Sequence, residues 1–155
     1  MNFKDAAEKN EPWIIEQRRF FHQCPELSEQ EKNTTLEIGK RLEEMGLEPH
    51  YYEGFTGLTA DIRGGKAGVG TKTVALRADI DALPVEERTG LAFCSKNQGV
   101  MHACGHDCHI SMLLGGAKML VEHKEELAGT VRLLFQPAEE VAVGAKYMIA
   151  HGALD

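Results

Sequence analysis

Two short apolar runs, separated by one long helical stretch, are the feature of this sequence that most limits its fold. Residues 73–78 and 131–135 are rich in β-branched and aliphatic side chains and are typical of buried strands. Between them, residues 107–123 repeat apolar side chains at helical spacing. Strand, crossover helix and strand form a βαβ unit. We therefore predict an α/β fold built on a largely parallel sheet covered by helices.

Polar residues follow both predicted strands where each strand ends. Asp79 and Asp81 come after the first strand, and Glu139 and Glu140 come after the second. A third polar cluster, residues 102–109, stands just before the helix and reads His-Ala-Cys-Gly-His-Asp-Cys-His. In sheets of this kind ligands gather beyond the carboxyl ends of the strands. We expect the three clusters to converge there.

Cys104 and His106 have the chemistry and the spacing of metal ligands. They flank Gly105, whose freedom lets the backbone turn so that both side chains can face one ion. Thiolate and imidazole bind Zn²⁺ and other borderline divalent ions well. A catalytic zinc site takes three protein ligands, often with a carboxylate among them. The pair Glu139-Glu140 supplies such a carboxylate, which favours a catalytic site.

The two adjacent glutamates are expected to have different roles, one as a metal ligand and the other as a general base. Neighbouring residues in an extended segment point in opposite directions. We assign Glu140 to the metal and Glu139 to the attacking water, as general base and then as proton donor to the leaving amine. Chemistry alone also allows the reverse order.

Four further residues are candidates for supporting the ligands. Asp79 and Asp81 would share one side of a strand, where a carboxylate can orient a metal-binding histidine, although turn chemistry is the alternative for Asp79. His109 is expected one helical turn along, facing inward. For Asp107, a supporting role competes evenly with simple stabilisation of the helix N-terminus. We expect no role for His102.

A structural zinc module is the competing interpretation of the same cluster. Cys104 and Cys108 could close around one zinc ion with two of the three nearby histidines, His102, His106 and His109. Such crowded ligands without a second half-site are unusual for structural zinc, and this reading leaves both glutamates unexplained.

Three segments together resemble the signature blocks of a known family. Residues 75–84 read ALRADIDALP, residues 101–109 read MHACGHDCH and residues 136–140 read QPAEE. In this order they resemble the metal-dependent N-acyl-L-amino-acid amidohydrolases of a metallopeptidase clan, which include aminoacylases, hippurate hydrolases and auxin-conjugate hydrolases. Residues 18–28 resemble the opening helix and turn of that family.

The resemblance implies a zinc-exopeptidase-like catalytic domain that binds two divalent ions, drawn from Zn, Mn, Co or Ni. Cys104, His106 and Glu140 would be metal ligands, Glu139 the general base and Asp81 the carboxylate that steadies the site. The substrate would be an N-acyl amino acid or a similar conjugate. Members of the family are much longer, so residues 1–155 would form the N-terminal part of the catalytic domain. The sheet would then be incomplete at its C-terminal side, without a lid or dimerisation domain. A truncated, inactive metal-binding fragment is the alternative.

The charge and composition of the chain limit the kinds of partner that it can bind. Twenty-four acidic against seventeen basic residues give a formal charge of −7, which does not suit a nucleic-acid binder. No secretory signal or membrane-spanning run is recognisable, so we expect a cytoplasmic protein that does not bind membranes. Four cysteines are too few for a disulfide framework. An open sheet edge would favour association, so a homo-oligomer is the alternative to a monomer.

Local signals predict the remaining elements. Asn10 and Pro12 indicate a helix start, and Ser28 with Glu31 indicates a capping box that opens a second helix. That helix would have an apolar stripe and end at Gly46. We also expect a strand over residues 58–62, a hairpin loop over residues 64–70 and a last helix over residues 144–150.

Overall fold

The computed structural model describes residues 2–66 and 72–155. It contains both helices and strands, with one short 3₁₀ helix after α3. In chain order they are α1 (Phe3–Gln23), α2 (Lys32–Glu44), β1 (His50–Tyr51), β2 (Leu58–Arg63), β3 (Thr73–Asp79), α3 (His106–Glu122), η1 (Lys124–Glu126), β4 (Thr130–Gln136) and α4 (Gly144–Ala150).

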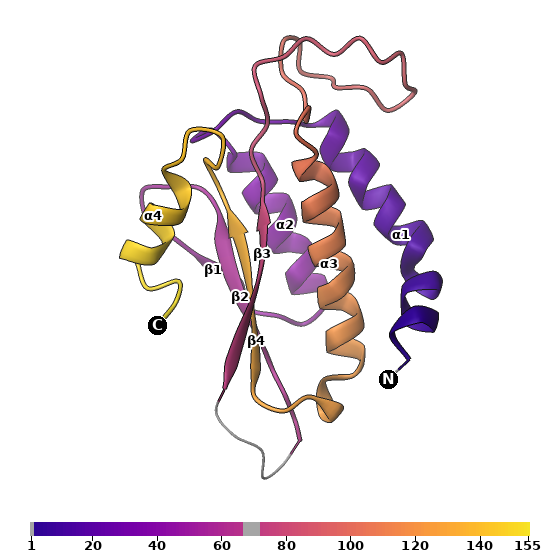
Figure 1. Ribbon diagram of the computed structural model, residues 1–155, viewed down its shortest axis with the longest axis vertical. Coiled ribbons are helices and arrows are strands. Elements are labelled where there is room, and N and C mark those ends of the chain that lie inside the picture. Colours follow the sequence, from indigo (N-terminus) through magenta and orange to yellow (C-terminus); the bar gives the residue numbers. More distant parts are fainter. Residues whose placement is uncertain (1, 67–71) are drawn as a thin grey trace.

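The predicted βαβ unit is present. Strands β3 and β4 pair in parallel from Thr73 opposite Thr130 to Asp79 opposite Gln136, and α3 forms the connection between them. The sheet order is β1-β2-β4-β3 (Figure 1).

The prediction of a largely parallel sheet is wrong for the strands described. Strand β2 runs antiparallel to both β1 and β4, so one of the three strand pairs is parallel. The alternation of Leu58, Ala60 and Ile62 fits a parallel or an antiparallel neighbour equally well, so it could not fix the direction. Because β4 lies between β2 and β3, residues 64–70 do not close a hairpin; of these, residues 67–70 lie outside the described residues.

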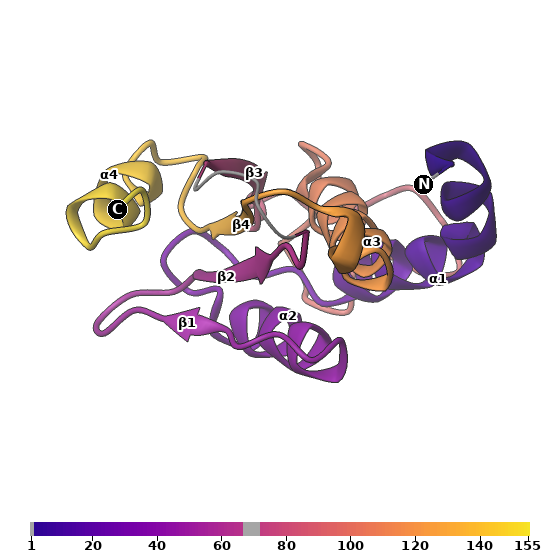
Figure 2. The same ribbon diagram turned by 90° about the horizontal axis from the view of Figure 1, so that it is seen from below.

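Alternate residues of β4 face two different layers. Leu133 and Phe135 point into the main core, beneath α1, α2 and α3. Leu134 contacts a smaller cluster formed with Tyr52 and Met148, the latter from α4. Figure 2 shows α4 on the other side of the sheet from the first three helices. No helix among residues 2–66 and 72–155 is long and apolar enough to span a membrane.

The first helix begins earlier than predicted. It starts at Phe3, with the side chain of Asn2 accepting a hydrogen bond from the Lys4 amide, and it includes Pro12. A proline inside a helix removes one backbone hydrogen bond. Here the helix continues through it because its face packs along α3, so tertiary contacts compensate for the local cost.

The predicted capping box is also wrong. The α2 helix begins at Lys32, and the side chain of Glu31 makes no capping bond. The Glu26 carboxylate takes that role by accepting the backbone amides of Asn33 and Thr34 at 3.2 and 2.7 Å. The apolar stripe of this helix is buried as predicted, and Gly46 follows it with φ 79°. Ser28 and Glu31 are therefore free for contacts elsewhere.

Candidate metal centre

The three predicted polar clusters meet at one end of the molecule. Strands β3 and β4 both end there, and α3 begins there, at the top of Figure 1. The convergence follows from the parallel pairing, because it brings Asp79 level with Gln136, three residues before Glu139.

His106 is at the centre of the cluster. Its Nδ1 atom lies 2.8 Å from the backbone carbonyl oxygen of Asp81, which leaves Nε2 to face the other side chains. Carboxylate oxygens of Asp79, Glu139 and Glu140 lie 3.5, 3.7 and 3.8 Å from Nε2. Burial lowers the pKa of His106, but its contacts with Asp81 and the charge of Asp79 outweigh this and raise the pKa to about 9. The surrounding carboxylates thus favour a positive charge at this point.

Cys104, His106 and Glu140 form a group that fits a divalent ion. Their ligand atoms all lie within 4.8 Å of one another. Glu140 Oε1 is buried and accepts no hydrogen bond from the described residues. Burial and then the neighbouring Glu140 raise the pKa of the Cys104 thiol, a repulsion that a cation would relieve. A thiolate, an imidazole and a carboxylate suit zinc and similar ions.

A second group of candidate ligands shares the same histidine. Asp79, His106 and His109 also bring their ligand atoms within 4.8 Å. His109 is half exposed, and its Nδ1 atom lies 2.5 Å from Asp79 Oδ1. Two aspartates and His109 thus lie beside His106, where the sequence placed its supporting residues.

Asp81 connects the histidine to the glutamate segment. Its Oδ2 atom accepts hydrogen bonds from the Ser28 hydroxyl at 2.7 Å and from the Glu140 backbone amide at 3.0 Å. Its Oδ1 atom lies 3.3 Å from His106 Nδ1. Burial raises the pKa of Asp81, yet the bonds from His106, Ser28 and Glu140 together lower it to about 2.

Glu139 and Glu140 do not point in opposite directions. The expectation assumed an extended segment, whereas both residues lie in a turn after β4 and both approach His106 Nε2. They differ in exposure instead: the Glu139 side chain is 40% exposed and that of Glu140 is 18% exposed. The more accessible carboxylate is the one to which we assigned the proton transfers.

Asp107 belongs to a buried ionic network behind the cluster. Its Oδ2 atom lies 2.8 Å from Arg18 Nε and 2.7 Å from His22 Nδ1. His22 Nε2 lies 3.1 Å from Glu87 in the long connection between β3 and α3. Sequence reasoning gave His22 no function, because nothing local links residue 22 to residue 107. The network joins α1, α3 and the connection at the base of the cluster.

Cys108 and His102 do not join a group of candidate ligands among the described residues. His102 is 4% exposed, and burial lowers its pKa to about 4. All four cysteines are free thiols. The geometry therefore favours the site with Glu140 over a zinc module built on Cys104 and Cys108.

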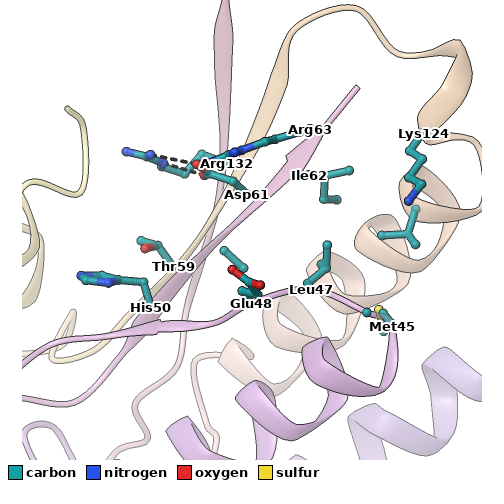
Figure 3. A pocket seen from close by; sticks show the side chains of 13 residues that line it. Met45, Leu47, Glu48, His50, Thr59, Asp61, Ile62, Arg63, Lys124 and Arg132 are labelled. Carbon is teal, nitrogen blue, oxygen red and sulfur yellow. Dashed lines mark hydrogen bonds and ion pairs between the residues drawn. The ribbon is translucent and has the colours of Figure 1, made fainter. Parts of the chain in front are cut away.

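A separate hollow of about 400 Å³ lies away from this cluster (Figure 3). Its wall includes Arg63 at the end of β2, Arg132 near the start of β4 and Lys124 at the start of η1. Asp61 on β2 pairs with Arg132 on the neighbouring strand β4. These elements present their opposite ends to the metal cluster.

An α/β fold with a thiol, an imidazole and paired carboxylates gathered at its strand ends suits the binding of a divalent metal ion. The chain belongs to Peptidase family M20/M25/M40, whose sequence profile matches residues 75–155, more than half of the chain.

Similar proteins agree with this membership. Thermostable carboxypeptidase 1 of Saccharolobus solfataricus is 51% identical over 98% of this chain and 39% of its own length. N-acetyl-L-cysteine deacetylase of Bacillus subtilis is 51% identical over 94% of this chain and 34% of its own length. The crystal structure of the Bacillus subtilis YXEP protein, a dinuclear metal-binding peptidase of the M20 family, superposes with a TM-score of 0.89 at 45% identity. That match covers 96% of this chain and 41% of the YXEP chain.

The chain thus spans 34–41% of the length of these relatives. Together the matches support membership of this peptidase family.

Proposed function

We propose that this chain carries part of the active site of a hydrolase that cleaves the amide bond of N-acyl amino acids or similar conjugates. The observation that carries the proposal is the group Cys104, His106 and Glu140, whose ligand atoms lie within 4.8 Å, with the exposed Glu139 carboxylate beside it. The products would be a carboxylate and a free amino acid. The names of the relatives support this substrate class, since a carboxypeptidase and an N-acetylcysteine deacetylase both release an amino acid from an amide.

Cys104, His106 and Glu140 would hold a divalent ion, with His106 oriented by Asp81. When bound, such an ion supplies Lewis acidity that polarises the amide carbonyl of the substrate. Glu139 would accept a proton from the water that attacks this carbonyl. It would then deliver the proton to the nitrogen that leaves as the amine when the C–N bond breaks. Asp79, His109 and Asp107 would support the ligands without touching substrate.

The lengths of the relatives support a further part of the proposal. Residues 1–155 would be the N-terminal part of the catalytic domain, and a lid or dimerisation domain would not be included in them.

Metal content and hydrolysis test these roles separately. Elemental analysis of protein purified without added metal should find about stoichiometric metal in the wild type and in Glu139→Gln, but little in Glu140→Ala. The matched control is Glu122→Gln, at the other end of α3. Metal retained by Glu140→Ala would overturn its assignment as a ligand.

Hydrolysis of N-acetyl amino acids should be assayed with this chain and with any longer protein that contains it. At equal metal content, Glu139→Gln should lower kcat by about 100-fold to 10,000-fold, the usual contribution of a general acid–base group. Wild-type kcat in Glu139→Gln would contradict its role as the base. Metal binding without hydrolysis by the 155-residue chain would favour the inactive metal-binding fragment.

A further inference from the structure

The turn that carries both glutamates is not favoured by its own backbone. Ala138 has φ 49° and Ala142 has φ 59°, both in the left-handed region. This region is unfavourable for a residue that carries a Cβ atom. Contacts from elsewhere in the protein must therefore hold the turn in this conformation.

Glu31, 107 residues earlier in the chain, makes one of those contacts. Its Oε1 atom accepts the backbone amide of Ala138 at 2.8 Å, and its Oε2 atom accepts the hydroxyl of Thr56 at 2.6 Å. The side chain is 0% exposed. A buried carboxylate is costly unless its oxygens are paired, and these two hydrogen bonds offset part of that cost for Glu31.

Glu31 is itself fixed in place. The Thr35 hydroxyl donates to its backbone carbonyl at 2.6 Å and accepts the amide of Gly57 at 2.9 Å. Gly57 lies against Pro137, because a Cβ atom at residue 57 would be 2.5 Å from the proline ring. Glu31, Thr56 and Gly57 thus form a rigid support under the residues Pro137 and Ala138.

The two sides of the glutamate turn are anchored by different carboxylates. Glu31 holds the amide of Ala138, before Glu139, and Asp81 holds the amide of Glu140, after it. Fixing both amides fixes the direction in which the two glutamate side chains leave the backbone. Both then reach His106 Nε2 within 3.8 Å.

We propose that Glu31 is a positioning residue of the active site, which sets the placement of Glu139 and Glu140 through the amide of Ala138. The proposal rests on the proposed function, because it presumes that Glu140 binds the metal. Glu31 is in neither group of candidate metal ligands, and its effect would pass through the amide of Ala138.

Two substitutions of Glu31 distinguish the effect of its hydrogen bonds from the effect of its side-chain volume. In Glu31→Gln the amide oxygen can accept from Ala138, and the NH₂ group can donate to the Thr56 hydroxyl, which also accepts. Glu31→Met keeps a similar size and accepts neither bond. Glu26→Ala is the matched control, since it removes the cap of α2 in the same segment without contacting the glutamate turn.

Cobalt(II) is a suitable probe, because its visible absorption reports the number and type of its ligands. The affinity for Co²⁺ should fall by about 10-fold to 100-fold in Glu31→Met, as usual when a residue that orients the ligands is lost. The absorption at saturating Co²⁺ should change as well. Glu31→Gln should match the wild type in both. Glu26→Ala should unfold at a lower temperature and keep the wild-type affinity and spectrum.

A lower unfolding temperature in Glu31→Met with wild-type affinity and spectrum would overturn the proposal, because Glu31 would then be only structural. If Glu31→Met does not fold, Thr56→Val provides the same test, since it removes one of the two hydrogen bonds to Glu31. We expect a smaller loss of Co²⁺ affinity in this variant. An unchanged affinity would overturn the proposal. No Co²⁺ binding by the wild type would overturn the proposed function itself, and the positioning role with it.

Discussion

His106 Nδ1 lies 2.8 Å from the carbonyl oxygen of Asp81, while the carboxylate of the same aspartate holds Ser28 and the Glu140 amide. One residue thus orients an imidazole through its backbone and a glutamate through its side chain. Because His106 and Glu140 are both expected metal ligands, Asp81 connects the ligand on α3 to the ligand in the turn after β4.

Asp81→Asn should therefore weaken metal binding without removing a ligand. The asparagine keeps the shape of the side chain but presents an NH₂ group either to the donors Ser28 and Glu140 or to His106. We expect the dissociation constant for Zn²⁺ to rise by about 10-fold to 100-fold, measured by competition with a chromophoric chelator. Asp61→Asn, at the far end of the sheet, is the control. Equal affinities for wild type and Asp81→Asn would contradict this role.

Asp107 should matter most for stability. Asp107→Ala leaves Arg18 without its carboxylate and His22 with one fewer partner, in a place with little water. We expect a loss of about 3–5 kcal/mol in the free energy of unfolding, the usual cost of breaking a buried ionic group. Asp61→Ala breaks the more exposed pair with Arg132 and should cost at most about 1 kcal/mol. Urea unfolding of both variants checks this, and equal losses would contradict it.

The parts of the site that could be predicted are those encoded by neighbouring residues. An apolar run followed within a few residues by carboxylates places Asp79, Asp81, Glu139 and Glu140 near strand ends. The Cys-Gly-His spacing places two candidate ligands at the start of the helix. Parallel pairing of β3 and β4 then brings them together. Each of these steps depends on a pattern a few residues long.

The residues that support the site could not be found in this way. Ser28 and Glu31 have the spacing of a capping box, so the sequence predicts local hydrogen bonds for both side chains. In the structure they bind distant residues instead, Ser28 to Asp81 and Glu31 to Ala138. The direction of β2 was missed for a similar reason, since its alternating pattern suits either neighbour. These contacts join residues 53 and 107 positions apart, and a sequence pattern of about ten residues cannot indicate them.

Two neighbouring glycines of α3 should respond in opposite ways to alanine. A Cβ atom at residue 116 meets nothing within 4 Å, so Gly116→Ala should stabilise the protein by about 0.5–1 kcal/mol through helix propensity. At residue 115 the new atom would lie 2.5 Å from Ile14 Cδ1 on α1. Overpacking of about 1–3 kcal/mol should then cancel or reverse that gain. Thermal unfolding compares the two, and a more stable Gly115→Ala would contradict the close contact of α1 with α3.

The pH dependence of stability should reveal the buried charge of Glu31. Burial raises the pKa of Glu31 above its ordinary value of 4.5, and the bonds from Thr56 and Ala138 offset only part of this effect. Between the unfolded and the folded pKa the folded protein binds more protons than the unfolded chain. Ionisation of Glu31 therefore lowers stability as the pH rises through that window.

Glu31→Gln removes this dependence while keeping both hydrogen bonds. Relative to the wild type, we expect the variant to gain stability as the pH rises from 4 towards 7. Asp61→Asn should show the opposite trend, because the hydrogen bond from Arg132 lowers the pKa of Asp61 below 3.8, and the stability it contributes is lost as the pH falls. Urea unfolding of both variants between pH 3 and pH 7 measures the two slopes. If both differences had the same sign, the Glu31 carboxylate could not be the strained buried charge that its surroundings indicate.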